Sequence, residues 1–285
     1  MLWVYLNGEL VAAGRAALPA LDRGLLYGYG LFETMRSYSG RVFRLAEHYR
    51  RLEAGAELLA IPVPLTLAAL EEAVDATLAR NGLPDAYVRL TVTAGPGGDG
   101  GNASVILFAR EVTEYPPELR ERGMAAVVSA VRRNETSPLA RVKSLNCLDN
   151  LLAREEARRS GAGEALLLNT RDFIAEGAAS NVFLVRNGTL VTPGVEAGAL
   201  PGITRQAVLE LAGEEGIEVV ETSLALPGLA GAGEAFLTNS VMEVMPLVSV
   251  DGRPVGPGSP GPLTERLARR YRDLVARETS TAPAV

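Results

Sequence analysis

The sequence predicts an α+β protein built from two domains. Segments of helical periodicity are mixed with runs rich in β-branched and aromatic residues, and a polar segment with two prolines divides the chain. A length of 285 residues allows two medium-sized domains, and a hydrophobic content of 47% is ample for a core. We expect a small N-terminal α/β domain over 1–111, a linker over 112–123 and a larger, β-rich C-terminal domain over 124–285.

The N-terminal half begins with a predicted hairpin, because Asn7-Gly8 is a strong two-residue turn signal between two β-rich runs. The turn Ser39-Gly40 precedes RVFRL, which we expect to be a strand. Apolar residues at helical spacing and alternating β-rich runs define the remaining elements. We predict helices over 46–59 and 65–82, and strands over 86–94 and 104–110.

The C-terminal half contains more strands than helices in this interpretation. MAAVVSAV, from Met124, is the first predicted strand, and the hairpin over 181–193 turns at an Arg-Asn-Gly sequence. Glycine follows two of the helical patterns, as expected at a helix end. We predict helices over 148–161, 203–216 and 262–277, strands over 164–169, 217–221 and 235–239, and a frayed tail over 278–285.

Composition excludes several classes of function. A net charge of −6 argues against nonspecific nucleic-acid binding, and no run of about 18 apolar residues predicts a membrane span. The first ten residues lack the basic region of a signal peptide. Cys147 and His48 are each the single residue of their type, so we expect no intrachain disulfide, no metal site and no Ser-His-Asp triad. A cytoplasmic protein is the expectation.

Lys143 is the single lysine beside 27 arginines. Codon drift in a GC-rich genome explains the bias, but not why one position stayed lysine. An arginine side chain is always protonated, whereas a lysine amine can lose its proton and form a Schiff base. Lys143 also falls between a predicted strand and a predicted helix, a loop position that suits function.

Three further motifs follow Lys143. The run from Glu176 through Ser180 sets a carboxylate beside small residues, which allow a flat ring to approach the backbone. PGITR, from Pro201, opens a predicted helix whose first amides suit a phosphate. LTNSV, from Leu237, ends a predicted strand with hydroxyl side chains. Each motif alone also fits a turn or a helix cap.

Taken in order, KSLN, EGAASN, PGITR and the Thr/Ser strand end resemble the class IV (fold-type IV) pyridoxal-phosphate enzymes. These include branched-chain aminotransferases, D-amino-acid aminotransferases and aminodeoxychorismate lyases. The resemblance extends to the first half through DRG at 22–24, YGYGLFETMR at 27–36, FR at 43–44 and EHYRRL at 47–52. It covers nearly the whole chain and implies a two-domain fold that binds pyridoxal 5′-phosphate.

The resemblance assigns roles at the cofactor. Lys143 would form the Schiff base and move a proton at the substrate Cα, which requires a pKa below the usual value of about 10.4. Glu176 would pair with the protonated pyridine nitrogen and keep the ring an electron sink. His48 is expected to be structural. The other expected cofactor-binding residues are Arg51, Ser180, Gly202, Ile203, Thr204 and Ser240, of which Arg51, Ser240, the Ile203 and Thr204 amides and the Thr204 hydroxyl would bind the phosphate.

The substrate remains open between several members of the family. The motif Tyr87-Val-Arg89 resembles branched-chain enzymes, whereas Thr34 resembles the lyases. The loop 94–102 carries no cation, unlike that of D-amino-acid enzymes and many lyases, and Asp99 stands in it. Cys147 replaces a tyrosine that branched-chain enzymes tend to have. The expected substrate-binding residues are Tyr27, Phe32, Arg36, Arg89 and Val241.

The favoured hypothesis is a transaminase that moves an amino group from an aliphatic L-amino acid to a 2-oxo acid such as 2-oxoglutarate. The alternatives are a 4-amino-4-deoxychorismate lyase, a D-amino-acid or (R)-amine transaminase of the same fold, and a catalytically idle binding protein on this scaffold. The expected partners are the small-molecule amino donor and keto-acid acceptor, with neither nucleic acid nor membrane. The resemblance also implies a homodimer.

Overall fold

A computed structural model describes residues 1–97, 102–113, 115–229 and 231–280. The chain forms two compact units. The first comprises residues 1–113, 142–146 and 275–285, and the second comprises 114–141 and 147–274. Both units combine helices and sheets, which confirms the predicted α+β class.

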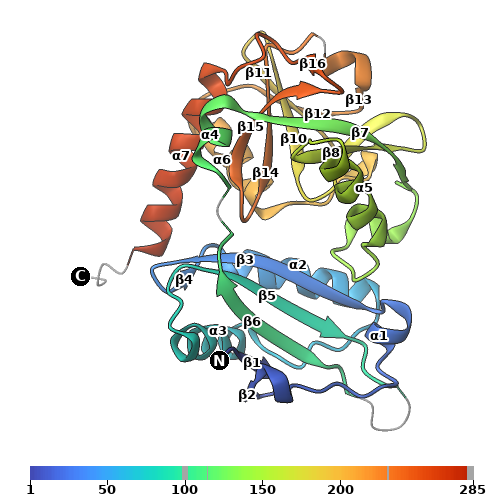
Figure 1. Cartoon of the computed structure of the whole chain (residues 1–285), viewed down its shortest axis with the longest axis vertical. Coiled ribbons are helices and arrows are strands. Elements are labelled where there is room, and N and C mark those ends of the chain that lie inside the picture. Colours follow the sequence, from blue (N-terminus) through green and yellow to red (C-terminus); the bar gives the residue numbers. More distant parts are fainter. Residues whose placement is uncertain (98–101, 114, 230, 281–285) are drawn as a thin grey trace. The chain divides into compact units, whose positions relative to one another are not determined.

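The first unit is built on a six-stranded sheet in the order β2-β1-β6-β5-β3-β4, with every neighbouring pair antiparallel (Figure 1). The Asn7-Gly8 turn closes the β1–β2 hairpin as predicted, with both residues at positive φ. The elements of this unit are β1 (Trp3–Leu6), β2 (Glu9–Ala12), η1 (Ala13–Arg15), α1 (Arg23–Tyr27), β3 (Gly30–Tyr38), β4 (Arg41–Val42), α2 (Leu45–Leu58), α3 (Leu67–Asn81), β5 (Ala86–Thr93) and β6 (Val105–Glu111).

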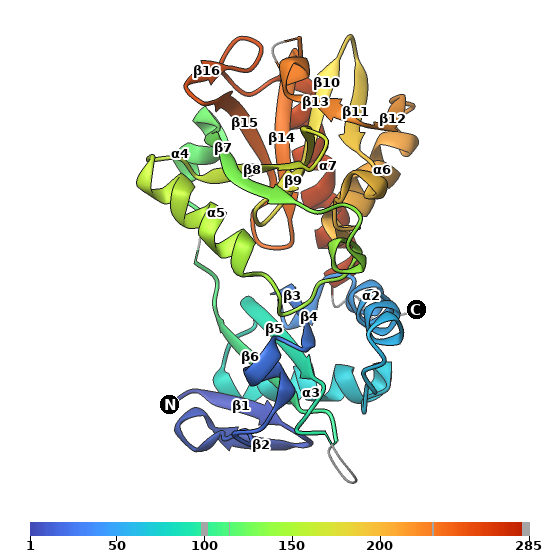
Figure 2. The ribbon, with the colours of Figure 1, turned by 90° about the vertical axis from the view of Figure 1, so that its right-hand side faces the viewer.

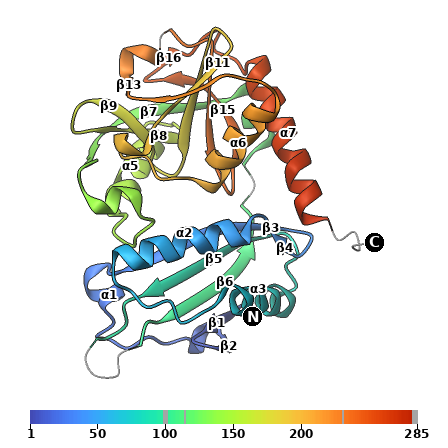
Figure 3. The same ribbon diagram turned by 180° about the vertical axis from the view of Figure 1, so that it is seen from behind.

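Helices α2 and α3 cover one face of this sheet (Figure 3). Alternate residues of β3, β5 and β6 are buried against them, because successive side chains of a strand point to opposite faces. The resulting core includes Leu31 and Met35 of β3, Leu52 of α2 and Leu70 of α3. The opposite face carries the half-buried residues of the same strands.

The second unit contains a ten-stranded mixed sheet in the order β12-β11-β10-β14-β15-β7-β8-β9-β13, with β16 paired to β15. Its elements are α4 (Pro117–Arg122), β7 (Met124–Arg133), η2 (Pro138–Arg141), α5 (Leu148–Arg159), β8 (Glu164–Asn169), β9 (Phe173–Gly177), β10 (Asn181–Arg186), β11 (Thr189–Pro193), η3 (Val195–Ala197), α6 (Ile203–Glu214), β12 (Val219–Thr222), β13 (Leu224–Ala225), η4 (Leu226–Leu229), β14 (Glu234–Asn239), β15 (Glu243–Val250), β16 (Arg253–Pro254) and α7 (Pro262–Thr279), whose last residues from Val275 belong to the first unit.

Parallel pairing is confined to part of this sheet. Strand β7 pairs in parallel with both β8 and β15, and β11 pairs in parallel with β12, whereas the other neighbours are antiparallel. Helix α5 connects β7 to β8 and packs on both strands, as the parallel connection requires (Figure 2).

Several local expectations were wrong. RVFRL gives only the two-residue strand β4, because Arg44 adopts φ +54° and the chain enters α2 at Leu45. The expected linker 112–123 includes the helix α4, which begins with Pro117. The predicted tail begins two residues too early, since α7 continues to Thr279. Strands β3, β9, β13, β15 and β16 were not predicted, and the residues of β3 and part of β9 were interpreted only as family motifs.

No helix among residues 1–97, 102–113, 115–229 and 231–280 combines the length and apolarity needed to span a membrane. Over the same ranges, His, Cys, Asp and Glu side chains form no group of three or more that could hold a metal ion.

Candidate active site

Lys143 lies in a loop that is hydrogen-bonded to β3. The Phe32 amide donates to the Lys143 carbonyl at 2.9 Å, and the Leu145 amide donates to the Gly30 carbonyl at 2.9 Å. Leu31 and Ser144 form an antiparallel bridge between these bonds. Residues 142–146 therefore belong to the first unit, although the chain on both sides belongs to the second. The loop position expected for Lys143 is as predicted.

The Phe32 ring lies against two cationic side chains of the first unit. Lys143 Nζ is 4.6 Å from the ring centroid, and Arg89 Cζ is 3.9 Å from it. Arg36 follows Phe32 by four residues in β3, and its Cζ lies 4.8 Å from the centroid of the Tyr38 ring. The sequence-predicted residues Phe32, Arg36 and Arg89 therefore share the sheet face opposite the helices. An aromatic ring beside cations suits a substrate that carries both an apolar group and a carboxylate.

Tyr27 is the last residue of α1 and is 69% exposed. Asp22 caps this helix, because its Oδ1 accepts the Gly24 amide at 2.7 Å. Arg23, on the same helix, donates from Nη2 to the Ala94 carbonyl at 2.6 Å and from Nε to the Gly95 carbonyl at 3.2 Å. A cation from α1 therefore binds the base of the loop 94–102, which has none of its own.

Residues 98–101 lie outside the described residues, and Asp99 is among them. The described part at the start of the loop includes Gly95 and Gly97, both at positive φ. A Cβ on Gly95 would lie 2.0 Å from the Asn102 carbonyl oxygen, so this position requires glycine.

Arg51, expected at the phosphate, forms a two-point ion pair with Glu33 of β3. Its Nε donates to Oε1 at 2.8 Å and its Nη2 donates to Oε2 at 2.5 Å. His48 Nδ1 lies 2.7 Å from the same Oε2. The expected structural role of His48 agrees with this contact, which also connects it to a predicted cofactor residue. Glu33 was not predicted from the sequence.

Glu176, the expected partner of the pyridine nitrogen, lies near the end of β9. The Leu200 amide donates to its Oε2 at 2.8 Å, and Arg133 Nη2 is 3.4 Å from its Oε1. The residue is only 5% exposed, so its carboxylate is buried together with these partners. Buried carboxylates require such donors because desolvation disfavours the charge.

Arg133 lies at the end of β7, and its guanidinium forms an ion pair with Glu176. Hydrogen bonds to three other residues fix this guanidinium. Its Nε donates to the Gly198 carbonyl at 3.2 Å, its Nη1 to Asn150 Oδ1 at 3.4 Å and its Nη2 to the Ala140 carbonyl at 3.0 Å. The planar guanidinium therefore orients the Glu176 carboxylate with little freedom of its own.

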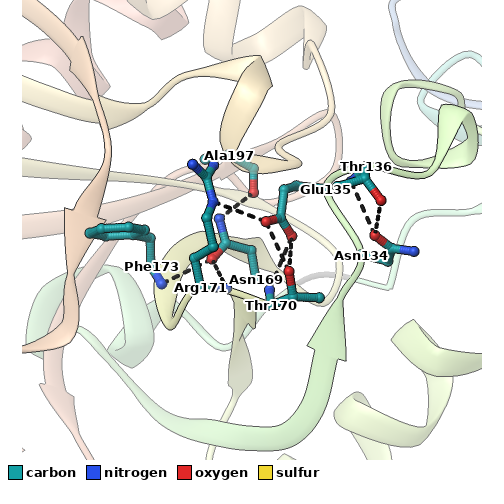
Figure 4. A network of polar contacts seen from close by, with 8 residues as sticks. All are labelled: Asn134, Glu135, Thr136, Asn169, Thr170, Arg171, Phe173 and Ala197. Atoms are coloured by element: carbon teal, nitrogen blue, oxygen red, sulfur yellow. Dashed lines mark hydrogen bonds and ion pairs between the residues drawn. The ribbon is translucent and has the colours of Figure 1, made fainter.

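A hydrogen-bonded network fixes the turn between β8 and β9 (Figure 4). The Glu135 carboxylate accepts the Thr170 amide at 3.0 Å and the Thr170 hydroxyl at 2.9 Å. Asn169 Nδ2 donates to the Ala197 carbonyl at 3.1 Å. The network joins the segment after β7, the β8–β9 turn and η3, and therefore supports the strand that carries Glu176.

The Ser180 hydroxyl donates to Glu164 Oε2 at 2.8 Å, and the Ala179 amide donates to the same oxygen at 3.3 Å. Burial raises the pKa of Glu164. Asn150 Nδ2 donates to the Ala178 carbonyl at 2.9 Å. The turn after Glu176 is therefore held by side chains on both sides, and the Ser180 hydroxyl faces Glu164.

The start of α6 has the features expected of the PGITR motif. Gly202 is the N-cap residue, and having no side chain it makes no cap hydrogen bond to the first amides of the helix. A Cβ on Gly202 would clash with Asn181 Oδ1, so a larger residue would have to displace the Asn181 side chain from its bond to the Leu200 carbonyl. The Thr204 hydroxyl is buried 3.5 Å from the Tyr271 hydroxyl, whereas the backbone amides of Ile203 and Thr204 begin the helix. These amides are oriented as donors for an anion.

Ser240 and Val241 lie in the turn between β14 and β15. Asn239 Oδ1 accepts the Val241 amide at 2.8 Å and the Met242 amide at 2.7 Å, which fixes the turn. Asn239 Nδ2 also donates to the Ala179 carbonyl at 2.8 Å, so the Ser240 turn is joined to the turn after Glu176. The Thr238 hydroxyl is buried without a hydrogen-bond partner among the described residues.

Comparisons with known proteins agree with these motifs. The model of the family described as amino-transferase class IV matches residues 30–250. A putative branched-chain-amino-acid aminotransferase of Methanocaldococcus jannaschii is 42% identical over 278 residues, which cover 95% of this chain and 96% of the relative. The branched-chain amino acid aminotransferase of Escherichia coli has a crystal structure with a TM-score of 0.92 and 35% identity, covering 98% of this chain and 96% of that one. The T.th. branched-chain amino acid aminotransferase with pyridoxamine 5′-phosphate has a TM-score of 0.90 and 32% identity, covering 97% of this chain and 95% of that one.

Proposed function

The chain belongs to the class IV aminotransferase family, and from that premise we propose that it is a pyridoxal-phosphate-dependent transaminase of aliphatic L-amino acids. The amino group would pass from a donor such as leucine or valine to a 2-oxo acid such as 2-oxoglutarate. The observation that carries the proposal is the single lysine, Lys143, fixed on β3 beside Phe32 in a chain that resembles branched-chain enzymes over nearly its whole length.

The residues present have the donor chemistry that pyridoxal phosphate requires. Lys143 supplies an amine, Glu176 a buried carboxylate, and Ile203 and Thr204 the amides of a helix start whose N-cap residue, Gly202, has no side chain to cap them. When bound, pyridoxal phosphate supplies a carbonyl that takes up the amino group and a ring that withdraws electrons from the substrate Cα.

Lys143 Nζ would take the proton from the substrate Cα and would deliver it to the C4′ carbon of the cofactor. Its backbone bonds to β3 fix the point from which the side chain extends. The Glu176 carboxylate would accept a hydrogen bond from the protonated pyridine nitrogen, and Arg133 would hold the carboxylate in place. Ser180, through its bond to Glu164, would keep the adjoining turn in shape.

The phosphate would be bound by Arg51, by the Ile203 and Thr204 amides and by the Ser240 hydroxyl. The amides at the start of a helix and an arginine guanidinium are both strong hydrogen-bond donors to a phosphate. The buried position of the Thr204 hydroxyl beside Tyr271 supports a role for its amide rather than for its side chain.

The substrate would be bound by Tyr27, Phe32, Arg36, Arg89 and Val241. The Phe32 ring favours an aliphatic side chain, and Arg89, 3.9 Å from that ring, favours a carboxylate of the 2-oxo acid.

We further propose that the protein is a homodimer that works in the cytoplasm. Large apolar side chains of the first unit are exposed at Leu21, Leu25 and Leu26, and those of Leu148, Leu151 and Leu152 are exposed on α5. Apolar clusters of this kind mark protein interfaces. Sedimentation equilibrium tests the proposal: a monomer at micromolar concentration would contradict it.

The transaminase proposal is tested with the purified protein and its yellow absorption band. We expect L-leucine or L-valine to bleach the band and 2-oxoglutarate to restore it. D-amino acids and (R)-amines are the matched alternative donors, and a response to these alone would favour the related transaminases. Release of pyruvate from aminodeoxychorismate would favour the lyase, and a protein that never takes up the cofactor would refute each of these enzymes.

A further inference from the structure

A charged cluster interrupts the core face of β3. Glu33 lies between the buried residues Leu31 and Met35 and is 1% exposed, as is His48, which reaches it from α2. Burying an ion pair costs more free energy than burying apolar side chains of the same size. An apolar residue at position 33 would complete the core more cheaply, so the carboxylate is expected to serve a purpose other than stability.

The geometry of the cluster fixes one guanidinium group. Arg51 and His48 are three residues apart on α2 and therefore point to the same side of the helix. Arg51 contacts both oxygens of Glu33 through one edge of its fork, with N–O distances of 2.8 and 2.5 Å. Two parallel bonds set the plane as well as the position of the guanidinium.

The ionisation state of Glu33 determines which atom donates in the hydrogen bond between His48 and Glu33. Burial raises the pKa of Glu33, but the Arg51 charge and the bonds from His48 and Arg51 outweigh it and hold the pKa at about 2. The carboxylate is therefore ionised at neutral pH and can only accept, so His48 Nδ1 carries the hydrogen of their 2.7 Å bond. Burial lowers the pKa of His48, which makes the ring a neutral donor.

We infer that Glu33 is a positioning residue that orients the Arg51 guanidinium for the phosphate of pyridoxal phosphate, and that His48 holds Glu33 in place. The inference rests on the proposed function, since it needs the cofactor to be pyridoxal phosphate. Arg51 would contact the phosphate with the edge of its fork that does not face Glu33. Without the Glu33 carboxylate, Arg51 would keep its charge, but the plane of its guanidinium would no longer be fixed.

The test compares two ligands that differ only in the phosphate. Full-length protein is stripped of cofactor and titrated with pyridoxal phosphate and, separately, with pyridoxal, and the dissociation constants are read from absorbance. We expect Glu33→Gln to weaken pyridoxal phosphate binding roughly tenfold, the equivalent of one bond to a charged group, and to leave pyridoxal binding within about twofold. The matched control is Glu47→Gln, because Glu47 pairs with Arg50 on the exposed side of the same helix at 3.6 Å.

A double-mutant cycle shows whether Glu33 acts through Arg51. In an Arg51→Lys background, Glu33→Gln should cause no further loss of pyridoxal phosphate affinity, because the fork is already gone. His48→Ala should also weaken pyridoxal phosphate binding, and His48→Asn should restore it, because the Asn Nδ2 can donate from the position of Nδ1. The His48 variants also test the inference if Glu33→Gln does not fold.

The outcomes separate the two proposals. Equal loss for pyridoxal phosphate and pyridoxal in Glu33→Gln would indicate a purely structural role and overturn the inference, as would unchanged affinity for both. Additive losses in the Arg51→Lys background would overturn it as well. A wild-type protein that binds neither ligand would overturn the proposed function and the inference together, whereas wild-type binding with an unaffected Glu33→Gln variant would overturn the inference alone.

Discussion

Replacing Asp22 with alanine is expected to destabilise the first unit by about 4 kcal/mol, because this side chain accepts hydrogen bonds from two buried hydroxyls and from one partly buried amide. Asp22 is fully buried. Its Oδ1 accepts the Gly24 amide at 2.7 Å, and its Oδ2 accepts the Thr93 hydroxyl at 2.7 Å and the Ser104 hydroxyl at 2.9 Å. One carboxylate therefore caps α1 and ties it to the end of β5 and the start of β6.

The magnitude follows from what alanine would leave behind. Each buried donor without a partner costs about 1–3 kcal/mol. The two hydroxyls can turn toward each other, which reduces the total, and loss of the helix cap contributes about 1 kcal/mol of it. Asp22→Asn keeps one oxygen for the Gly24 amide, so its cost should be about 2 kcal/mol.

The assay is urea unfolding followed by tryptophan fluorescence. Trp3 is the single tryptophan and lies in β1 of the same sheet, so its emission reports on the first unit. The control is Asp85→Ala, because Asp85 accepts only the exposed Ser39 amide at 3.1 Å among its described bonds and should cost less than about 1 kcal/mol. If Asp22→Ala costs no more than this control, or Asp22→Asn costs as much as Asp22→Ala, the reasoning from unsatisfied donors is refuted.

Three further predictions concern charge. Lys143→Arg keeps the positive charge but should abolish amino transfer and the yellow band, and measurable turnover by steady-state assay would contradict the role of the amine. Glu33 has a pKa of about 2 in the folded protein and 4.5 in the unfolded chain, so the stabilisation by its carboxylate is complete above pH 4.5. Urea titrations should show a loss of about 3 kcal/mol in the free energy of unfolding as the pH falls toward 2. Burial lowers the pKa of His48 from 6.5, so His48 adds to this loss because the unfolded chain takes up the proton first. Glu164 acts in the opposite sense, since burial raises its pKa, and its stabilisation is complete below pH 4.5 and lost as the pH rises through the folded value. Because glutamine does not titrate, the free energy of unfolding of wild type should fall relative to that of Glu164→Gln as the pH rises over that interval, and a difference independent of pH would contradict the assignment.

Elements whose signal is local were predicted well from the sequence. The β1–β2 hairpin follows from Asn7-Gly8 alone, because two residues at positive φ need that chemistry. Helix α6 was placed correctly because Gly202 precedes a clear helical pattern. The motif order also predicted the family, since four short patterns in sequence constrain one another more than any single one does.

Strand β3 shows why other elements were missed. Its burial alternates strictly from Leu31 to Tyr38, yet the buried positions include Glu33 and Ser37, which the sequence pattern does not identify as core. The buried polar residues hide the apolar alternation on which strand prediction depends.

The supporting residues of the candidate site could not be predicted, because their partners are distant in the chain. Arg133 of β7 contacts Glu176 of β9, and Glu164 of β8 contacts Ser180 in the turn between β9 and β10. Neither pair has a characteristic spacing. The only available signal is a charged residue at the end of a predicted strand, and many surface residues give the same signal.

The lysine loop has a second consequence for the molecule. Residues 143–145 bond to β3 along the edge that β4 leaves uncovered, since β4 pairs only with Ser37 and Tyr38. An uncovered strand edge is a template for pairing with another chain and hence for aggregation. The segment that presents the amine thus also shields the sheet from self-association, and substitutions that loosen its backbone should reduce solubility even where Lys143 is retained.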